Sequence, residues 1–348
     1  MVIVLVSLVF SCKKKNVVNP TPPLVTTGVY SLNQGNYGQN NTTISYYDFA
    51  TSTATTDYYQ DINGFGLGDT GSDFLIYGGK LYIVMNNSGN VAVTNALTLK
   101  FIDTISFISG GVNKGPENIV AYGTHVFVSS TDGTVAVIDT TSLTINKLIT
   151  VGSNPAQMAV SGANLYVSNS GAFSANYDST VSVIDLGSLT ETQKITVGIN
   201  PGCIAADNSG NIYIACAGNY AAVAPSLVKV NTSANTVTKS ADTAVGTIRY
   251  YNNYLFVTGG YLGVNNVREL STTDFSAVSS NFITDGTVVT TPYGLDIDNA
   301  TGNVYIGDAK DYVSPGEVFC FDKNGNKKFT FSTAPTASPI RTMLIQQQ

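Results

Sequence analysis

Three charged side chains, Asp73, Glu117 and Arg341, are the residues of this 348-residue chain best suited to hold a polar ligand. A guanidinium beside a pair of carboxylates can orient hydroxyl groups or a carboxylate through charge-assisted hydrogen bonds. The three residues lie far apart along the sequence, so a site that contains them requires a fold that returns the chain repeatedly to one place. The elements that position them must therefore repeat.

An aromatic-centred segment recurs about every 40 to 50 residues from residue 28 onward. Two copies are Tyr122–Ser129 (YGTHVFVS) and Ser161–Ser168 (SGANLYVS), and a strand that ends in Asp follows each of them, as in Thr134–Asp139 (TVAVID) and Thr180–Asp185 (TVSVID). The central aromatic residues of the copies are Tyr30, Tyr82, Phe127, Tyr166, Tyr213, Phe256 and Tyr305. Alternation of apolar and polar residues at period two, with Gly, Asn and Asp in between, indicates strands joined by hairpin turns.

The length of the repeat is typical of a four-stranded propeller blade. A single four-stranded sheet cannot bury both of its faces, so the blades must stack around a ring. The chain ends with Ala337–Ile345, which resembles an inner strand without the rest of its blade, and no such strand precedes Tyr30. We therefore predict an all-β fold for residues 28–348: a seven-bladed β-propeller of antiparallel blades, closed by the C-terminal strand.

The inner strands of such a ring bring one equivalent residue per blade to the rim of the central channel. Aligned by the proline that enters each strand, or by the distance to the central aromatic residue, these are Asp73, Asn118, Gln157, Cys203, Thr247, Gly294 and Arg341. With the neighbouring polar residues, the expected ligand-binding set is Asp73, Glu117, Asn118, Gln157, Thr247, Arg249, Tyr293 and Arg341. A polar lining is also what a solvated channel without a ligand would have.

Tyrosines in the predicted loops are a second candidate for ligand contact, because aromatic side chains can stack on sugar rings or anchor protein interfaces. Packing of the loops onto the rim is the alternative role. The residues are Tyr37, Tyr58, Tyr59, Tyr177, Tyr220, Tyr261 and Tyr312.

Two further motifs are interpreted as turns. Asp296–Asn303 (DIDNATGN) has the look of a calcium loop but lacks the glutamate at its end, so a hairpin turn is the better interpretation. Five prolines are expected in turns that enter inner strands, because proline fixes its own φ and biases its predecessor toward extended backbone. They are Pro116, Pro155, Pro201, Pro292 and Pro339.

The composition excludes several classes of function. With 17 Lys and Arg against 23 Asp and Glu, a net charge of −6 and no basic run in the body of the chain, a nucleic-acid partner is not expected. The sole histidine, His125, is predicted at the surface, which argues against a catalytic triad or a typical zinc site. We expect no catalytic residues, no metal and no cofactor.

The body of the chain contains three cysteines, Cys203, Cys216 and Cys320, and an odd number cannot form a complete disulfide framework. Cys203 and Cys216 fall on adjacent predicted strands and could form a disulfide in the right register. The alternative is buried free thiols.

The N-terminus reads as an export and anchoring signal. Met1–Phe10 (MVIVLVSLVF) is too short to span a bilayer and is typical of a signal-peptide core. Leu8–Cys12 (LVFSC) resembles the lipobox of bacterial lipoproteins, although no basic segment precedes it and Phe10 is bulky. The resemblance implies a lipoprotein signal peptide at residues 1–11 and lipidation of Cys12, followed by a flexible, Pro- and Thr-rich tether at 12–27. The expected location is the bacterial cell envelope, in the outer membrane through the lipid anchor, with the leaflet left open.

The repeats resemble those of YVTN-type surface-layer propellers. The matching segments are Val151–Pro155 (VGSNP), Val197–Pro201 (VGINP), Leu165–Asn169 (LYVSN) and Val181–Asp185 (VSVID). The opening Gly28–Gly38 (GVYSLNQGNYG) is similar to envelope lipoproteins of this class. Quinone-cofactor propellers that resemble this fold use tryptophan, which is absent from this chain.

The resemblance implies a fold rather than an activity, because propellers host many unrelated functions. We expect a monomeric, non-catalytic binding module whose partner is a glycan, a peptide or another envelope protein. The alternatives are a lyase- or lactonase-like enzyme with a metal in the channel, and a structural surface-layer component.

Overall fold

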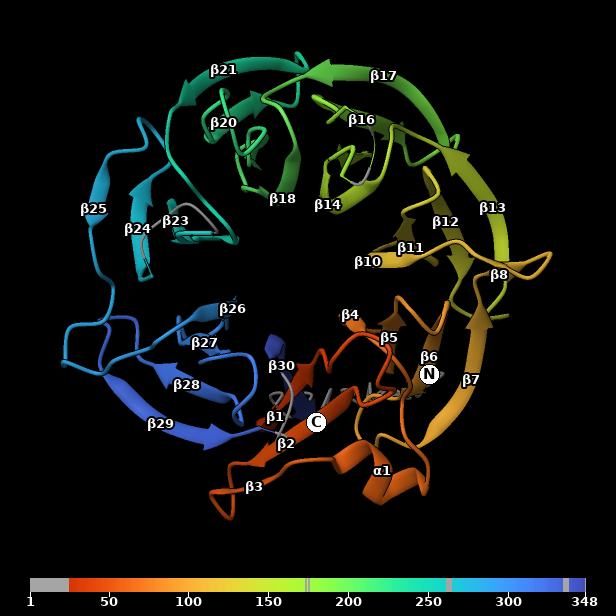
Figure 1. The fold of residues 1–348 in the computed structure, drawn as a ribbon, viewed down its shortest axis with the longest axis vertical. Helices are drawn as coiled ribbons and strands as arrows, with labels where there is room; N and C mark the ends of the chain where they lie inside the picture. Colours follow the sequence, from red (N-terminus) through yellow and green to blue (C-terminus); the bar gives the residue numbers. More distant parts are fainter. Residues whose placement is uncertain (1–24, 173, 175, 261–264, 334–337, 348) are drawn as a thin grey trace, which may run out of the picture.

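Seven four-stranded antiparallel sheets stand around a central axis in the computed structural model, which describes residues 25–172, 174, 176–260, 265–333 and 338–347. Figure 1 shows the ring along this axis, with the first strand of each blade nearest the centre. The predicted seven-bladed β-propeller is confirmed. The predicted signal peptide, Cys12 and Tyr261 lie outside the described residues.

The strands of each blade follow one another from the innermost to the outermost position in the sheet. Blade 1 contains β30 (Pro339–Gln347), β1 (Val25–Asn33), β2 (Thr43–Asp48) and β3 (Thr53–Thr55), and blade 2 contains β4 (Gly71–Tyr77), β5 (Lys80–Met85), β6 (Asn90–Asn95) and β7 (Phe101–Ser106). Blade 3 contains β10 (Pro116–Tyr122), β11 (His125–Ser130), β12 (Thr134–Asp139) and β13 (Ile145–Thr150), and blade 4 contains β14 (Pro155–Ser161), β15 (Asn164–Asn169), β16 (Thr180–Asp185) and β17 (Thr190–Thr196). Blade 5 contains β18 (Pro201–Ala206), β19 (Asn211–Cys216), β20 (Ser226–Asn231) and β21 (Thr236–Ala241), and blade 6 contains β22 (Ile248–Tyr251), β23 (Tyr254–Thr258), β24 (Val267–Ser271) and β25 (Ala277–Ser279). Blade 7 contains β26 (Pro292–Ile297), β27 (Val304–Asp308), β28 (Glu317–Phe321) and β29 (Lys327–Ser332).

Burial changes from the second strand of a blade to the fourth. The second strands are buried almost throughout, as in β11 and β15, because both of their faces pack against neighbouring blades. The fourth strands are mostly exposed, as in β7 and β13, because they form the outer wall of the ring. The seven predicted central aromatic residues all lie in second strands and none is more than 4% exposed. These side chains fill the spaces between blades, where a continuous apolar core is needed.

The ring closes between the two ends of the described chain. β30 pairs antiparallel with β1, with Thr342 opposite Ser31 and Arg341 opposite Leu32, and supplies the inner strand that blade 1 otherwise lacks. This closure was predicted from Ala337–Ile345. β1 begins at Val25, three residues before the predicted start at residue 28, because Val25 and Thr26 pair with Gln347 and Gln346.

Two elements outside the blades were not predicted. The helix α1 (Tyr58–Asn63) lies in the connection from blade 1 to blade 2, and Asp57 caps its first turn by accepting a hydrogen bond from the backbone N–H of Gln60. Tyr59 in this helix is buried and Tyr58 stacks on Tyr46 with ring centroids 4.8 Å apart, so the prediction that these two tyrosines lie in loops was wrong. A small hairpin of β8 (Ile108–Ser109) and β9 (Val112–Asn113) projects from the connection between blades 2 and 3.

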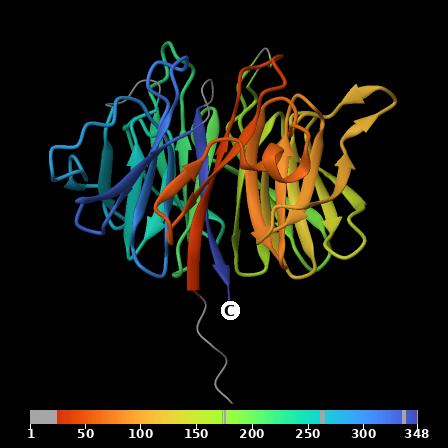
Figure 2. The ribbon, with the colours of Figure 1, turned by 90° about the horizontal axis from the view of Figure 1, so that it is seen from below.

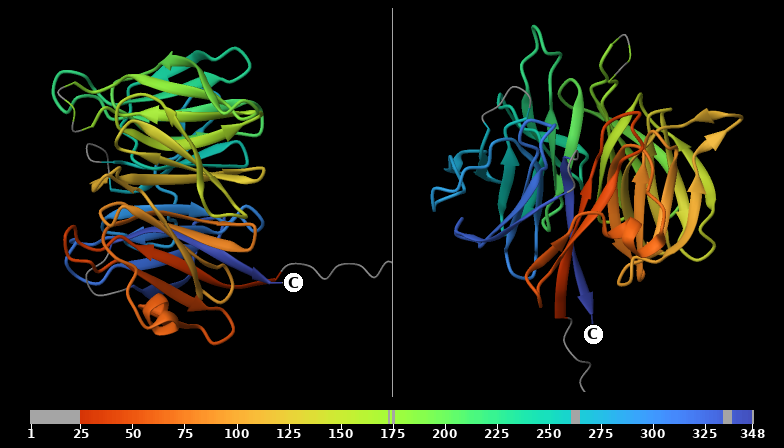
Figure 3. Two further views of the ribbon diagram at one scale, coloured as in Figure 1. Left: turned by 90° about the vertical axis from the view of Figure 1, so that its right-hand side faces the viewer. Right: turned by 60° about the horizontal axis from the view of Figure 1, so that its bottom comes forward.

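The two faces of the ring differ. The chain enters every inner strand from one face, where the loops after the second strands also lie, and Figure 2 shows the longer loops on that face. Val25 and Gln347 pair at the opposite face, where the coloured ends of β1 and β30 lie side by side in Figures 2 and 3. None of the described helices has the length and apolarity needed to cross a bilayer.

Candidate functional site

A β-bulge near the start of the inner strands directs their side chains into the channel. Register shifts fall between Gly71 and Asp73 in blade 2, and between Pro116 and Ile119 in blade 3, and comparable shifts occur in blades 1, 4, 5 and 7. A regular strand alternates its side chains between two faces, whereas a bulge re-aims them. As a result, consecutive residues such as Glu117 and Asn118 both line the channel.

The five prolines named above are the first residues of β10, β14, β18, β26 and β30, rather than turn residues. Proline lacks an N–H donor and is tolerated at a strand start or beside a bulge. The register also confirms the alignment of the blades. In every blade, one inner-strand residue pairs with the residue that follows the central aromatic residue. The residue directly before that inner-strand residue is the predicted equivalent position, which holds Asp73, Asn118, Gln157, Cys203, Thr247, Gly294 and Arg341.

A cavity of about 680 Å³ occupies the mouth of the channel on the face where the inner strands begin; we call it the rim cavity. All eight residues predicted to bind a ligand line it, namely Asp73, Glu117, Asn118, Gln157, Thr247, Arg249, Tyr293 and Arg341. The loops after the second strands of blades 1, 6 and 7 add further lining residues, among them Gln34, Asn265 and Tyr312. The structure thus brings the predicted residues together, and their binding of a ligand stays a prediction.

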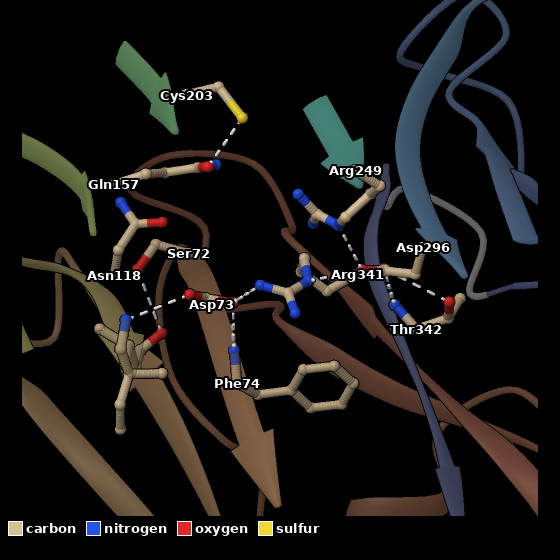
Figure 4. A network of polar contacts seen from close by, with 12 residues as sticks. Ser72, Asp73, Phe74, Asn118, Gln157, Cys203, Arg249, Asp296, Arg341 and Thr342 are labelled. Atoms are coloured by element: carbon tan, nitrogen blue, oxygen red, sulfur yellow. Dashed lines mark hydrogen bonds and ion pairs between the residues drawn. The ribbon is translucent and has the colours of Figure 1, made fainter. Parts of the chain in front are cut away.

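The floor of the rim cavity is an ion-pair network that includes one residue the sequence reasoning missed (Figure 4). Arg341 pairs with Asp73 through Nη1, and its Nε lies 3.2 Å from Asp296 Oδ1. The same carboxylate oxygen accepts a hydrogen bond of 3.0 Å from Arg249 Nε. A second cavity of about 330 Å³ on the other side of the two guanidinium groups is lined by Arg249, Asp296 and Arg341, so the network separates two spaces within the channel.

Asp296 had been assigned only to the predicted turn at 296–303. The turn itself is present, with Gly302 N donating to Asp298 O at 2.7 Å. Asp296, however, lies two residues after Gly294 in blade 7. Arg249 lies two residues after Thr247, the equivalent of Gly294 in blade 6, so Asp296 and Arg249 occupy equivalent positions. Extending the comparison of inner strands by that one position would have found it.

Burial and ion pairing act in opposite directions on the charges of the floor. Burial lowers the pKa of Arg341, but the Asp296 and Asp73 carboxylates outweigh it and raise that pKa above its usual range. Burial raises the pKa of Asp73, while Arg341 and the backbone N–H groups of Ile119 and Phe74 oppose the increase. The oxygens of Asp73 accept hydrogen bonds from these two N–H groups at 3.1 and 2.9 Å as well as from Arg341. Asp73 is therefore fully occupied by contacts within the protein.

Polar contacts near the channel link every pair of neighbouring blades, and we call this set the polar belt. Blades 1 and 2 are linked by Arg341 with Asp73, blades 2 and 3 by Ile119 N to Asp73 Oδ2 (3.1 Å), and blades 3 and 4 by Ser129 Oγ to Ala156 O (2.8 Å). Blades 4 and 5 are linked by Cys203 Sγ to Gln157 Oε1 (2.8 Å), and blades 5 and 6 by Ile248 N to Cys203 Sγ (3.2 Å). Blades 6 and 7 are linked by Arg249 Nε to Asp296 Oδ1 (3.0 Å), and blades 7 and 1 by Thr342 N to Asp296 Oδ2 (2.7 Å). Asp73 and Asp296 each contribute to two blade interfaces. Four of the residues predicted to bind a ligand, Asp73, Gln157, Arg249 and Arg341, therefore also link neighbouring blades.

Glu117 differs from the other acids of the cavity because it has no cationic partner among the described residues. Asn86 Nδ2 donates to its Oε1 at 2.9 Å. Burial, and next the nearby Asp73 carboxylate, raise the pKa of Glu117 to about 7. Glu117 thus changes its protonation state near neutral pH, where it can act either as an acceptor or as a hydrogen-bond donor.

Cys203, Cys216 and Cys320 are free and buried, so the disulfide considered for Cys203 and Cys216 is not present. Cys203 points into the polar belt, whereas Cys216 packs against the backbone of Gly198. Burial raises the pKa of both thiols.

The predicted loop tyrosines have different surroundings. Tyr312 and Tyr293 meet edge to face on the wall of the rim cavity, with centroids 5.7 Å apart, and Tyr293 Oη donates to Gln34 Oε1 at 3.2 Å. Tyr177 and Tyr220 form a similar pair in the loops of blades 4 and 5, with centroids 6.1 Å apart. Tyr37 is 76% exposed.

His125 is partly exposed at the start of β11, where it pairs with Tyr122 and Asp139. This is the end of blade 3 that lies away from the rim cavity. Within the described part of the chain, no group of three or more His, Cys, Asp or Glu residues is arranged to hold a metal ion.

The fold and the site together define a seven-bladed β-propeller with a polar cavity at one mouth of its channel. Residues 27–328 match the family described as Domain of unknown function (DUF5074), and the chain belongs to that family. A search of curated proteins finds no match.

Several solved structures share the fold. A quinonprotein alcohol dehydrogenase-like protein from Bacteroides thetaiotaomicron is 15% identical, with a TM-score of 0.67 over 92% of this chain and 79% of that protein. Hydrazine synthase from Kuenenia stuttgartiensis is 19% identical, with a TM-score of 0.61 over 73% of this chain and 77% of that one. The computationally designed protein Ika8 is 12% identical, with a TM-score of 0.59 and 90% coverage of both chains. At these identities the similarity shows the propeller fold alone.

Loss of the Asp296 carboxylate should destabilise the ring. In Asp296→Ala, Arg249 and Arg341 lose a shared partner in a largely buried position, so we expect the free energy of unfolding to fall by about 3 kcal/mol in urea titrations. Glu191→Ala is the control: it removes the more exposed Lys194–Glu191 pair (3.2 Å), and should cost less than about 1 kcal/mol. Equal effects of the two substitutions would contradict a structural role for the polar belt.

Glu117 should make the protein less stable as the pH rises through the neutral range. Its pKa of about 7 in the folded state exceeds the ordinary value of 4.5, so its contribution is fully present below about pH 4.5 and is lost as the pH rises through about 7. Glu117→Gln mimics the protonated side chain. The free energy of unfolding of this variant minus that of wild type, measured in urea titrations, should be more positive at pH 8 than at pH 4.5. The expected change in this quantity between the two pH values is on the order of 3 kcal/mol. A difference that does not change with pH would show that Glu117 titrates normally.

Proposed function

We propose that this protein is a non-catalytic lipoprotein of the bacterial cell envelope that captures a ligand in the rim cavity. The observation that carries the proposal is the convergence of eight residues, chosen by their types and spacing, on one cavity of about 680 Å³. This volume lies within the range of about 300–1,000 Å³ typical of small-ligand sites. The lining combines amides, hydroxyls, guanidinium groups and two tyrosine rings, which are groups that orient a polar ligand.

The state of the charged residues favours binding over chemistry. Asp73, Arg249 and Arg341 are engaged with protein partners, and a group committed to an ion pair is poorly placed to transfer a proton. His125 lies at the other end of its blade. A rigid, prearranged wall of this kind can bind without the entropic cost of ordering the side chains.

The location of the first described strand supports a membrane-anchored arrangement. Val25 lies at the face opposite the rim cavity, and the proposed lipid anchor at Cys12 precedes it by only 13 residues. A tether fixed at that face leaves the mouth of the cavity directed away from the membrane. The resemblance of the repeats to surface-layer propellers of the YVTN type is consistent with this placement.

Capture of a ligand should depend on side chains that line the cavity, and those outside the polar belt test this without removing a contact between blades. We expect the immobilised protein to retain components of an envelope extract, detected by mass spectrometry. Tyr312→Ala and Glu117→Ala should each reduce that retention at least tenfold, because they remove part of the wall. Tyr37→Ala is the matched control, since this exposed tyrosine does not line the cavity. Equal retention by Tyr312→Ala, Glu117→Ala and wild type would refute the cavity as the site and favour a structural role for the outer surfaces of the blades.

Lipidation of Cys12 should determine the location of the protein in the cell. In a bacterial host supplied with a labelled fatty acid, the wild-type chain should carry the label and sediment with membranes. Cys12→Ser should lose both properties, whereas Cys320→Ser, which changes a buried thiol in the propeller, should keep the label. An unlabelled wild-type protein would rule out the lipid anchor.

A further inference from the structure

The charges around the rim cavity balance one another. Two acidic and two basic side chains line it, namely Asp73, Glu117, Arg249 and Arg341. Asp296, which lies directly behind the two arginines, accepts the hydrogen bond of Arg249 and lies 3.2 Å from Arg341. The two guanidinium groups are thus matched by the carboxylates of Asp73 and Asp296, which leaves Glu117 alone.

An ion entering the cavity finds no free counter-charge. An anion would have to compete with Asp73 and Asp296 for guanidinium groups that are only 22% and 19% exposed, and separating a largely buried ion pair is costly. A cation would find Asp73 occupied by Arg341 and by two backbone N–H groups. Glu117 is the remaining acid: Asn86 Nδ2 already donates to its Oε1 at 2.9 Å, and its burial favours the uncharged form.

The groups that remain available are neutral hydrogen-bonding groups and aromatic rings. The side-chain amide of Asn118 has no hydrogen-bond partner among the described residues, and Gln157 uses only its Oε1, as an acceptor for Cys203. Amides both donate and accept, which suits hydroxyl or amide groups of a ligand. On the facing wall, Tyr293 is fixed by Gln34 and by the perpendicular ring of Tyr312, so the pair forms a rigid aromatic surface for an apolar face of the ligand.

From this charge balance and these free groups, we propose that the ligand of the rim cavity is an electrically neutral small molecule rich in hydroxyl or amide groups, with one flat apolar face. A neutral oligosaccharide and a neutral compound with several amide groups share this chemistry. The inference rests on the proposed function and specifies the class of ligand at the same site. In this inference, Asn118, Gln157 and the Tyr293–Tyr312 pair recognise the ligand. Arg249 and Arg341 instead form part of the ion-pair network at the floor of the cavity.

The test separates this inference from the proposed function. A dialysable envelope extract is divided by ion exchange into neutral, anionic and cationic pools, and each pool is passed over the immobilised protein at about pH 6, where Glu117 is mostly protonated. We expect retention from the neutral pool to exceed that from either charged pool at least tenfold. Retention mainly from a charged pool would overturn the inference and leave the proposed function intact. Retention from none of the pools would remove the support for small-ligand capture altogether, and with it the inference.

Variants and a chemical treatment then locate and classify the ligand. Asn118→Ala and Tyr312→Ala should each weaken retention from the neutral pool at least tenfold, whereas Tyr37→Ala should leave it unchanged. Unchanged retention in both cavity variants would overturn the assignment of these residues. Periodate oxidises vicinal diols to carbonyl groups by cleaving the carbon–carbon bond between them, and it leaves amides intact. Loss of retention after periodate treatment of the pool therefore identifies a saccharide, and persistence identifies an amide-bearing ligand.

Discussion

Arg341 joins the last described strand to the blades on either side of it, at the point where the pairing of β30 with β1 closes the ring. Its guanidinium pairs with Asp73 of blade 2 and lies 3.2 Å from Asp296 of blade 7, while its own strand completes blade 1. Each of the inner strands β4, β10 and β22 contributes a buried apolar side chain to the core between blades, namely Phe74, Ile119 and Ile248. The polar belt adds ion pairs and hydrogen bonds between the blades there, and among the described residues it leaves Glu117 as the acid of the cavity without a cationic partner.

The sequence was sufficient to predict the fold because the same physical demand recurs in every blade. Each second strand must be buried on both faces, which produces the repeated aromatic segments around residues such as Tyr82 and Tyr166. The C-terminal strand was recognisable because it lacked partners in its own neighbourhood. The equivalent inner-strand positions could likewise be aligned, because the bulge sits at the same place relative to the central aromatic residue.

Features that depend on side-chain pairing between blades were not predictable in this way. An extended alignment of the inner strands would place Asp296 at the channel, but its contacts with Arg341 and Arg249, 45 and 47 residues away in sequence, follow only from the assembled ring. The raised pKa of Glu117 arises from burial in the assembled cavity, which a linear sequence does not display. The helix α1 has only six residues, too few for a visible periodicity, and the cap from Asp57 became evident only with its backbone partner.

The position of β1 within blade 1 bears on how the protein resists force. β1 is an interior strand with antiparallel partners on both sides, β2 and β30, and its first residue, Val25, is the point at which a pull on the N-terminal side of the propeller would act. Hydrogen bonds of an antiparallel sheet run perpendicular to the strands, so a pull along β1 loads two whole ladders at once in shear instead of opening them one bond at a time. The strand that closes the ring thereby also clamps the end of the chain on which a mechanical load would act.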